Sequence, residues 1–166
     1  METTNSNIGP KEERIQLVSF KLGNEEHGID VLKVREIIRS TSITRVPNIP
    51  RYVEGVINLR GKVIPVISLR NKFNLPDAES DNRTRVIVMD MASELMGFIV
   101  DSCADVVRIN VSQIQPPPPI VTGGIDQECI SGVIDHGDRL LVLLDLEKMF
   151  SPEDRSSFAE LSSSGE

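Results

Sequence analysis

GVINLRGKVIPVISLRNKF at residues 55–73 returns as GVIDHGDRLLVLLDLEKMF at residues 132–150, without a gap and at an offset of 77 residues (132 − 55). The two stretches share their first three residues, a later leucine and the final phenylalanine. Further matches upstream, at an offset of 69 (94 − 25), pair Glu25, Gly28 and Val31 with Glu94, Gly97 and Val100. Such a repeat predicts two similar small units, and it makes the differences between the copies informative.

The composition favours strands over helices. The chain of 166 residues has no Trp and one Tyr, so Val, Ile and Leu must fill its interior, and β-branched residues favour strands. We expect hairpins at residues 53–69, turning at Arg60-Gly61, at residues 83–101, and at residues 130–146, turning at His136-Gly137. Each copy then supplies four or five short strands, and a closed or half-closed barrel would remove the exposed edges of its sheet.

The chain is expected to comprise four segments. Residues 1–13 form a disordered tail, residues 14–82 the first unit, residues 83–150 the second unit, and residues 151–166 a short C-terminal helix and tail. Apolar residues at helical spacing predict a short helix over residues 31–39. The four consecutive prolines at positions 116–119 favour a stiff, extended spacer. The pattern leaves open whether strands are exchanged between the two copies.

Nothing in the sequence indicates a catalytic, metal or cofactor site. The two histidines, His27 and His136, have no carboxylate or thiol at ligand spacing, and we expect both at the surface. Cys103 and Cys129 are too few for a disulfide scaffold and are expected to be reduced and buried. No Gly-rich phosphate loop or nucleophile elbow occurs. We therefore predict a protein that is not an enzyme, that binds no cofactor or metal, and whose function resides in its surface.

The distribution of charge suggests a surface with a particular partner. Residues 31–72 carry nine Lys or Arg and two Glu, a net charge of +7, whereas the rest of the chain carries −14. The basic stretch could face an acidic partner or the acidic remainder of the chain, or it could simply be solvated. No apolar stretch approaches the roughly 20 residues that span a bilayer, and the polar N-terminus lacks a signal core. We therefore expect a cytoplasmic protein without direct membrane insertion.

The order of motifs resembles the CheW family of chemotaxis coupling proteins. GIDVLKVREI at residues 28–37 is followed by TRVPNIPRYVEGVINLRGKVIPVISLR at 44–70, GFIVDSCADVVRI at 97–109 and the second copy at 132–150. The resemblance covers residues 15–150. It implies two similar five-stranded SH3-like barrels packed together, with short helices. It also implies a non-catalytic adaptor that couples the cytoplasmic tip of a methyl-accepting chemoreceptor to the regulatory domain of a CheA-type histidine kinase.

The same resemblance implies a receptor-binding groove where the barrels meet. Its residues would be Val34, Glu36, Asn58, Arg60, Gly61, Gly97 and Val106. The valines would offer apolar contact to a helix, and Arg60 would offer a planar fork of donors. Arg60-Gly61 aligns with Gly137-Asp138 in the second copy, so the hairpin tip differs although the flanking strands repeat. Alternatively, Arg60 is simply solvated at the hairpin tip, and only the conformation of the turn matters.

Two other functions fit parts of the sequence. The basic stretch would suit a small barrel that binds nucleic acid, but the chain is acidic overall and offers few aromatic side chains for base stacking. The chain could also be part of a larger relative, such as the end of the kinase. The polar start at Met1 and the polar end after Leu161 instead favour a complete short protein.

Overall fold

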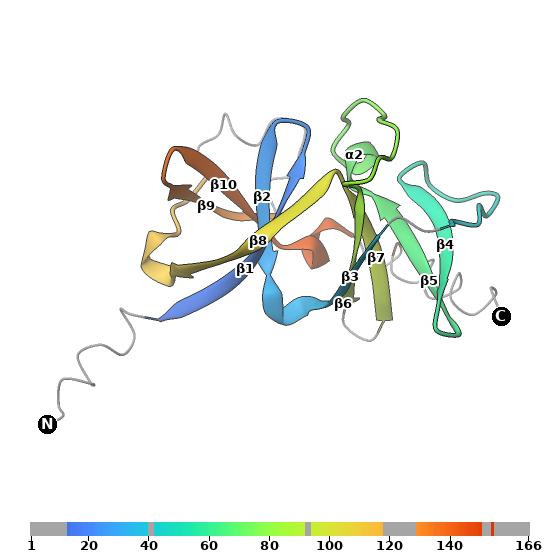
Figure 1. The fold of residues 1–166 in the computed structure, drawn as a ribbon, viewed down its shortest axis with the longest axis horizontal. Helices are drawn as coiled ribbons and strands as arrows, with labels where there is room; N and C mark the ends of the chain where they lie inside the picture. The colour runs from blue at the N-terminus through green and yellow to red at the C-terminus, as the bar shows by residue number, and fades with distance from the viewer. Residues whose placement is uncertain (1–12, 40–41, 92–93, 118–128, 151–153, 155–166) are drawn as a thin grey trace, which may run out of the picture.

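The chain forms two five-stranded mixed sheets (Figure 1). The structure, a computed structural model, describes residues 13–39, 42–91, 94–117, 129–150 and 154. The strands of sheet A, in spatial order, are β8 (Ser102–Asn110), β1 (Arg14–Leu22), β2 (Glu25–Asp30), β10 (Arg139–Leu144) and β9 (Ile130–His136). The strands of sheet B are β3 (Val34–Arg39), β6 (Arg85–Met91), β7 (Glu94–Val100), β5 (Lys62–Ser68) and β4 (Val53–Leu59). The expected mainly β fold with two five-stranded units is confirmed.

The sheets exchange strands between the two sequence copies. The repeat makes β1 to β5 equivalent to β6 to β10, yet sheet A contains β1 and β2 together with β8, β9 and β10. Sheet B contains the complementary set. Equivalent residues pair with equivalent partners. Gly28 lies opposite Leu143 in the parallel pair of sheet A, and their repeat equivalents, Gly97 and Val66, lie opposite each other in sheet B. Neither sheet is therefore built from a single copy of the repeat: sheet B takes the consecutive strands β3 to β7, and sheet A takes the strands on either side of them.

Repeated glycines at positions 55 and 132 allow a second segment to lie against each outer hairpin. Thr44 forms an isolated bridge with Val56, and Gln115 forms the equivalent bridge with Val133. A Cβ added to Gly55 would lie 2.1 Å from the Thr44 carbonyl oxygen, and one added to Gly132 would lie 2.8 Å from that of Gln115. Glycine therefore recurs at this position of the repeat for a steric reason, because a neighbouring backbone segment lies too close for a Cβ.

The apolar side chains form three clusters. One lies within sheet A around Leu17, Ile134 and Leu141, and a second lies within sheet B around Ile57, Ile64 and Val86. The largest cluster takes side chains from both sheets and joins them into one core. It includes Phe20, Phe98 and Phe150. The two sheets therefore form one body, with the boundary between them filled by aromatic and aliphatic packing.

The helix expected over residues 31–39 was wrong. Only Val31–Lys33 forms a single 3-10 turn (η2), which the Asp30 side chain caps by accepting from the Leu32 N–H at 3.0 Å. The chain then extends as β3, which pairs with β6. The apolar spacing that suggested a helix comes largely from Val and Ile, whose branched side chains fit a strand, and pairing with β6 decides the outcome.

Three further short helices in the described part of the chain each follow a strand. They are α2 (Leu69–Lys72), η3 (Val111–Gln113) and η6 (Leu146–Met149). The Ser68 hydroxyl caps α2 by accepting from the Asn71 N–H at 3.2 Å. Residues 1–12, Pro118 and Pro119, and nearly all of segment 151–166 lie outside the described residues. The expected tail, C-terminal helix and second half of the proline run are among them.

Candidate protein-interaction site

The tip of the β4–β5 hairpin presents Arg60 to solvent on a strained turn. Arg60 and Gly61 both have positive φ, 52° and 88°, as a type I′ turn requires. The Gly61 N–H donates to Asn58 Oδ1 at 2.9 Å and fixes the turn from the strand side. A Cβ on Gly61 would meet nothing within 4 Å, so Gly61 serves the backbone conformation alone. A non-glycine residue with positive φ is uncommon, and such strain often accompanies function.

Arg60 forms a two-pronged ion pair with Glu36. Its Nη1 donates to Glu36 Oε2 at 3.3 Å, and its Nη2 donates to Oε1. The hydrogen bond from Arg60 lowers the pKa of Glu36, and the same contact raises that of Arg60. Glu36 lies on β3 and Arg60 follows β4, which are the two edge strands of sheet B. The pair therefore connects the two edges of one sheet.

The second copy has no counterpart of this pair. The repeat offsets place Asp105 at the position of Glu36 (36 + 69) and Gly137 at that of Arg60 (60 + 77). Gly137 has no side chain to offer. Its φ of 68° is positive like that of Arg60, but Asp138, in the position of Gly61, does not have a positive φ, so the turn is not the type I′ turn of the first copy. The two hairpin tips therefore differ in backbone conformation as well as in exposed charge.

The remaining predicted site residues lie in three different settings. Val34 begins β3, directly after the chain has crossed from sheet A to sheet B, and packs half-buried against the shared core. Val106 lies on β8 of sheet A and is 49% exposed. Gly97 is buried on β7, where an added Cβ would lie 2.8 Å from Val86 Cγ1. The structure thus brings Glu36, Asn58, Arg60 and Gly61 together, and gives Gly97 a position inside sheet B.

Two exposed apolar residues near this site escaped the sequence analysis. Leu32 on η2 is 87% exposed, and Ile37 projects from β3 with 41% of its surface exposed. Ile37 is the repeat equivalent of Val106 (37 + 69). The expected helix hid this relation, because only an extended β3 places Ile37 with Arg35 and Arg39 on the outward face. The repeat offset was the signal that could have found it.

Much of the basic stretch faces the acidic part of the chain. Its ion pairs join Lys33 to Glu147 at 2.9 Å, Arg35 to Asp90 at 3.4 Å and Arg70 to Asp101 at 2.6 Å. The aromatic rings of Phe20, Phe73 and Phe98 are buried and cannot stack on bases. These contacts favour internal neutralisation of the basic charge over a nucleic-acid surface.

The expectation of a surface position for His27 was wrong. His27 is fully buried, its ring stacks on Phe20 with centroids 5.5 Å apart, and neither ring nitrogen has a hydrogen-bond partner in the structure. Burial lowers the pKa of His27 to about 4, so the ring is neutral near pH 7. Phe73 lies on its other side at 6.0 Å. A lone histidine within an apolar strand pattern is thus part of the packing here.

The thiols and carboxylates give no sign of chemistry. Cys129 is buried as expected, whereas Cys103 is only partly buried, and burial raises its pKa to about 11, which keeps the thiol protonated. Within the described ranges no three His, Cys, Asp or Glu side chains are grouped to hold a metal ion. No helix in the same part of the chain is long and apolar enough to cross a membrane.

Comparisons with known proteins agree with this architecture. Residues 16–154 match the family model of the CheW-like domain. The chemotaxis protein CheW of Klebsiella aerogenes is 40% identical over 139 residues, which cover 84% of this chain and 83% of that protein. The chemotaxis protein CheW of Treponema pallidum is 35% identical over 154 residues, 90% of each chain. The crystal structure of the scaffolding protein TtCheW from Thermoanaerobacter tengcongensis matches with a TM-score of 0.77 and 32% identity, over 86% of this chain and 91% of that one. The chain therefore belongs to the CheW family of chemotaxis proteins.

Proposed function

We propose that this protein is a scaffold that couples the cytoplasmic tips of methyl-accepting chemoreceptors to the regulatory domain of a CheA-type histidine kinase. The observation that carries the proposal is the Arg60–Glu36 pair, a charged contact on a strained tip that only one copy of the repeat possesses. Family membership supports it, because the relatives are chemotaxis proteins and one is a scaffolding protein. The protein would act in the cytoplasm and join membrane receptor arrays through its partners.

The receptor would lie over the edge of sheet B and the adjoining part of sheet A. Arg60 offers a planar set of donors that can bind backbone carbonyls or a carboxylate at the end of a helix. Val106 and Ile37 offer exposed apolar surface to a helical partner. Holding receptor and kinase at once raises the effective concentration of each for the other. The scaffold would need no chemistry of its own, only different affinities for the active and inactive kinase.

Arg60→Ala should weaken receptor binding about tenfold or more, because Arg residues at the centre of an interface often dominate affinity. Thermal unfolding should change little, since the Arg60 side chain is 72% exposed and, among the described residues, its hydrogen bonds go to Glu36 alone. Lys62→Ala is the matched control, because Lys62 opens β5 beside the same tip and forms no ion pair in the described part of the chain. Pull-down with receptor fragments measures both. Wild-type binding by Arg60→Ala would refute the role of Arg60.

Val106→Asp should reduce binding to receptor while leaving the fold intact, because half of this side chain already faces solvent. Leu140→Asp is the matched control on the same sheet, at 48% exposure. Val34 is a poorer test, since it packs on the shared core and its replacement would also destabilise the protein. Receptor and kinase should be assayed separately. If Val106→Asp lost only kinase binding, Val106 would belong to the kinase surface.

A further inference from the structure

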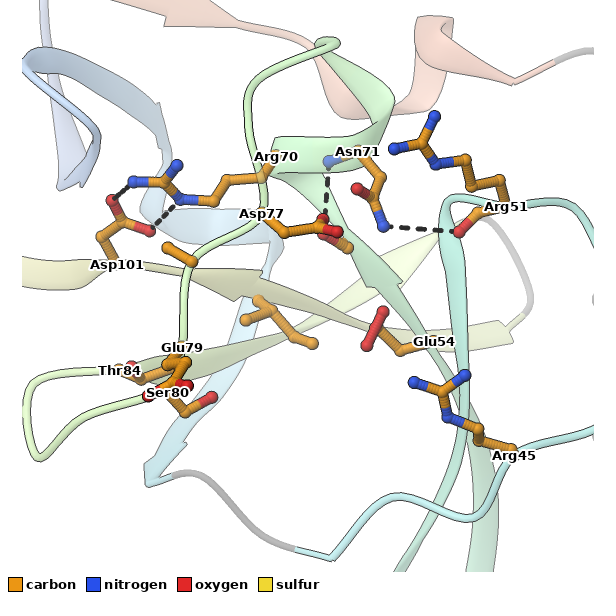
Figure 2. Close-up of a pocket in the computed structure, with 13 residues that line it drawn as sticks. Arg45, Arg51, Glu54, Arg70, Asn71, Asp77, Glu79, Ser80, Thr84 and Asp101 are labelled. Atoms are coloured by element: carbon orange, nitrogen blue, oxygen red, sulfur yellow. Dashed lines mark hydrogen bonds and ion pairs between the residues drawn. The ribbon is translucent and has the colours of Figure 1, made fainter.

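A hollow of about 380 Å³ lies at the opposite end of β4 from Arg60 (Figure 2). Its walls come from the start of β4, from α2 and from the loop that joins α2 to β6. Six residues separate Glu54 in the hollow from Arg60, which corresponds to roughly 20 Å along a strand. The hollow is thus a separate feature from the proposed receptor site, and its volume suits a small ligand.

One side of the hollow is held rigidly by Arg70. Its Nε and Nη2 donate to the two carboxylate oxygens of Asp101 at 2.9 and 2.6 Å, and its Nη1 donates to the Pro76 carbonyl at 2.7 Å. Asp101 also accepts from the Gly23 N–H at 2.7 Å, and its pKa is lowered chiefly by the hydrogen bond from Arg70. These contacts fasten the α2–β6 loop to both sheets. Arg70 and Asp101 neutralise each other and are not free to bind a ligand.

Other polar groups in the hollow have no partner. Within the described residues, the side chains of Arg45, Arg51 and Glu54 form no hydrogen bond or ion pair, although all three line the hollow. Asn71 Nδ2 donates to the Arg51 carbonyl at 3.4 Å, whereas Asn71 Oδ1 is buried and accepts nothing. A buried acceptor without a donor is costly. The hollow therefore presents both unmatched donors and an unmatched acceptor.

Charges of both signs line the hollow. Figure 2 shows Arg45, Arg51 and Glu54 on the β4 side and Asp77 and Glu79 on the loop across from them. The lining carries three arginines and four carboxylates, a formal charge of −1 (3 − 4). A simple anion would be opposed by this net charge, and a simple cation would leave the arginines unmatched. A ligand with both charges can pair with the unmatched arginines and with the carboxylates of the loop.

We propose that the hollow binds a small zwitterion, a free amino acid or a short peptide. Its carboxylate would accept from Arg51 and Arg45, because guanidinium forks match a carboxylate. Its ammonium group would donate to the carboxylates of Asp77 and Glu79. The proposal goes beyond the scaffold function and does not depend on it, since none of these residues belongs to the Arg60 site.

The test is titration of the ¹⁵N-labelled full chain with glycine, diglycine and triglycine, monitored by NMR. At least one of them should shift the side-chain amide signals of Asn71 and saturate in the millimolar range. N-Acetylglycine, which keeps only the carboxylate, and glycinamide, which keeps only the ammonium, should each bind about tenfold more weakly or worse. Inorganic phosphate should not compete.

Two variants of residues that line the hollow test whether the zwitterion binds there. Arg51→Ala and Asp77→Asn should each weaken the zwitterion about tenfold, whereas Arg108→Ala, at an exposed position on β8 of sheet A, should leave it unchanged. The proposal is overturned if no zwitterion shifts the spectrum by about 50 mM, or if N-acetylglycine or phosphate binds as tightly as the best zwitterion. It is equally overturned if Arg51→Ala and Asp77→Asn bind like the wild type.

Discussion

Gly55→Ala is expected to destabilise the protein by about 3 kcal/mol, which is a large part of the 5–15 kcal/mol that typically maintains a fold. The new methyl carbon would lie 2.1 Å from the Thr44 carbonyl oxygen, and Gly55 has a φ of 149° that other residues rarely adopt. Relief requires Thr44 to move away. That movement breaks two hydrogen bonds of 2.9 Å each, between Thr44 and Val56.

Gly137→Ala is the matched control for this change. Gly137 also has a positive φ, 68°, but an added Cβ would meet nothing within 4 Å. It should therefore cost only about 1 kcal/mol, the strain of a left-handed backbone. Denaturant unfolding of both variants measures the difference. Equal losses would show that backbone strain alone matters at Gly55 and that the bridge to Thr44 does not constrain it.

Acidification from pH 6.5 to pH 4 is expected to remove about 3 kcal/mol of stability through His27 alone. Its folded pKa of about 4 lies below the usual value of 6.5 for histidine, so the unfolded chain binds the extra proton first. Stability from this group is therefore complete above about pH 6.5, falls as the pH is lowered, and is lost near pH 4. The physical cause is desolvation of an imidazolium between Phe20 and Phe73.

His27→Met isolates this contribution. Methionine already occupies the equivalent position in the other copy, as buried Met96 (27 + 69), so the replacement has a precedent in the same fold. Carboxylates with lowered pKa, such as Asp101, lose their contribution in acid in both proteins and cancel in the comparison. Denaturant melts at pH 7 and pH 4.5 should give a smaller difference for the variant. Identical pH dependence would mean that His27 is not buried in the neutral form.

Local patterns predicted the hairpins, because a turn such as Arg60-Gly61 and the alternation around it are properties of neighbouring residues. The repeat could not predict the order of the strands in each sheet, because it is equally compatible with strands that pair within one copy and strands that pair between the two copies. β3 was misread because its Val and Ile residues fit two periodicities, and only its pairing with β6 distinguishes them.

The sequence could name candidate residues for the site but could not predict their arrangement. Glu36 and Arg60 were both expected to matter, yet their ion pair joins residues 24 positions apart on opposite edges of a sheet. The hollow could not be foreseen. It draws Arg45, Asn71 and Asp101 from separate stretches of the chain, and its defining features are an unmatched acceptor and unmatched charges of both signs.

The exchange of strands sets an order for folding during synthesis. Sheet B is complete once the ribosome has released Val100, because all its strands lie between Val34 and that residue. β1 and β2 emerge first but must wait for partners as distant as Leu143, which pairs with Gly28. Until then Leu17 and Phe20 lack most of their neighbours in sheet A. β1 and β2 are thus synthesised before the strands of sheet B, yet sheet A around them is completed only after sheet B, and their apolar side chains remain prone to aggregation in the interval.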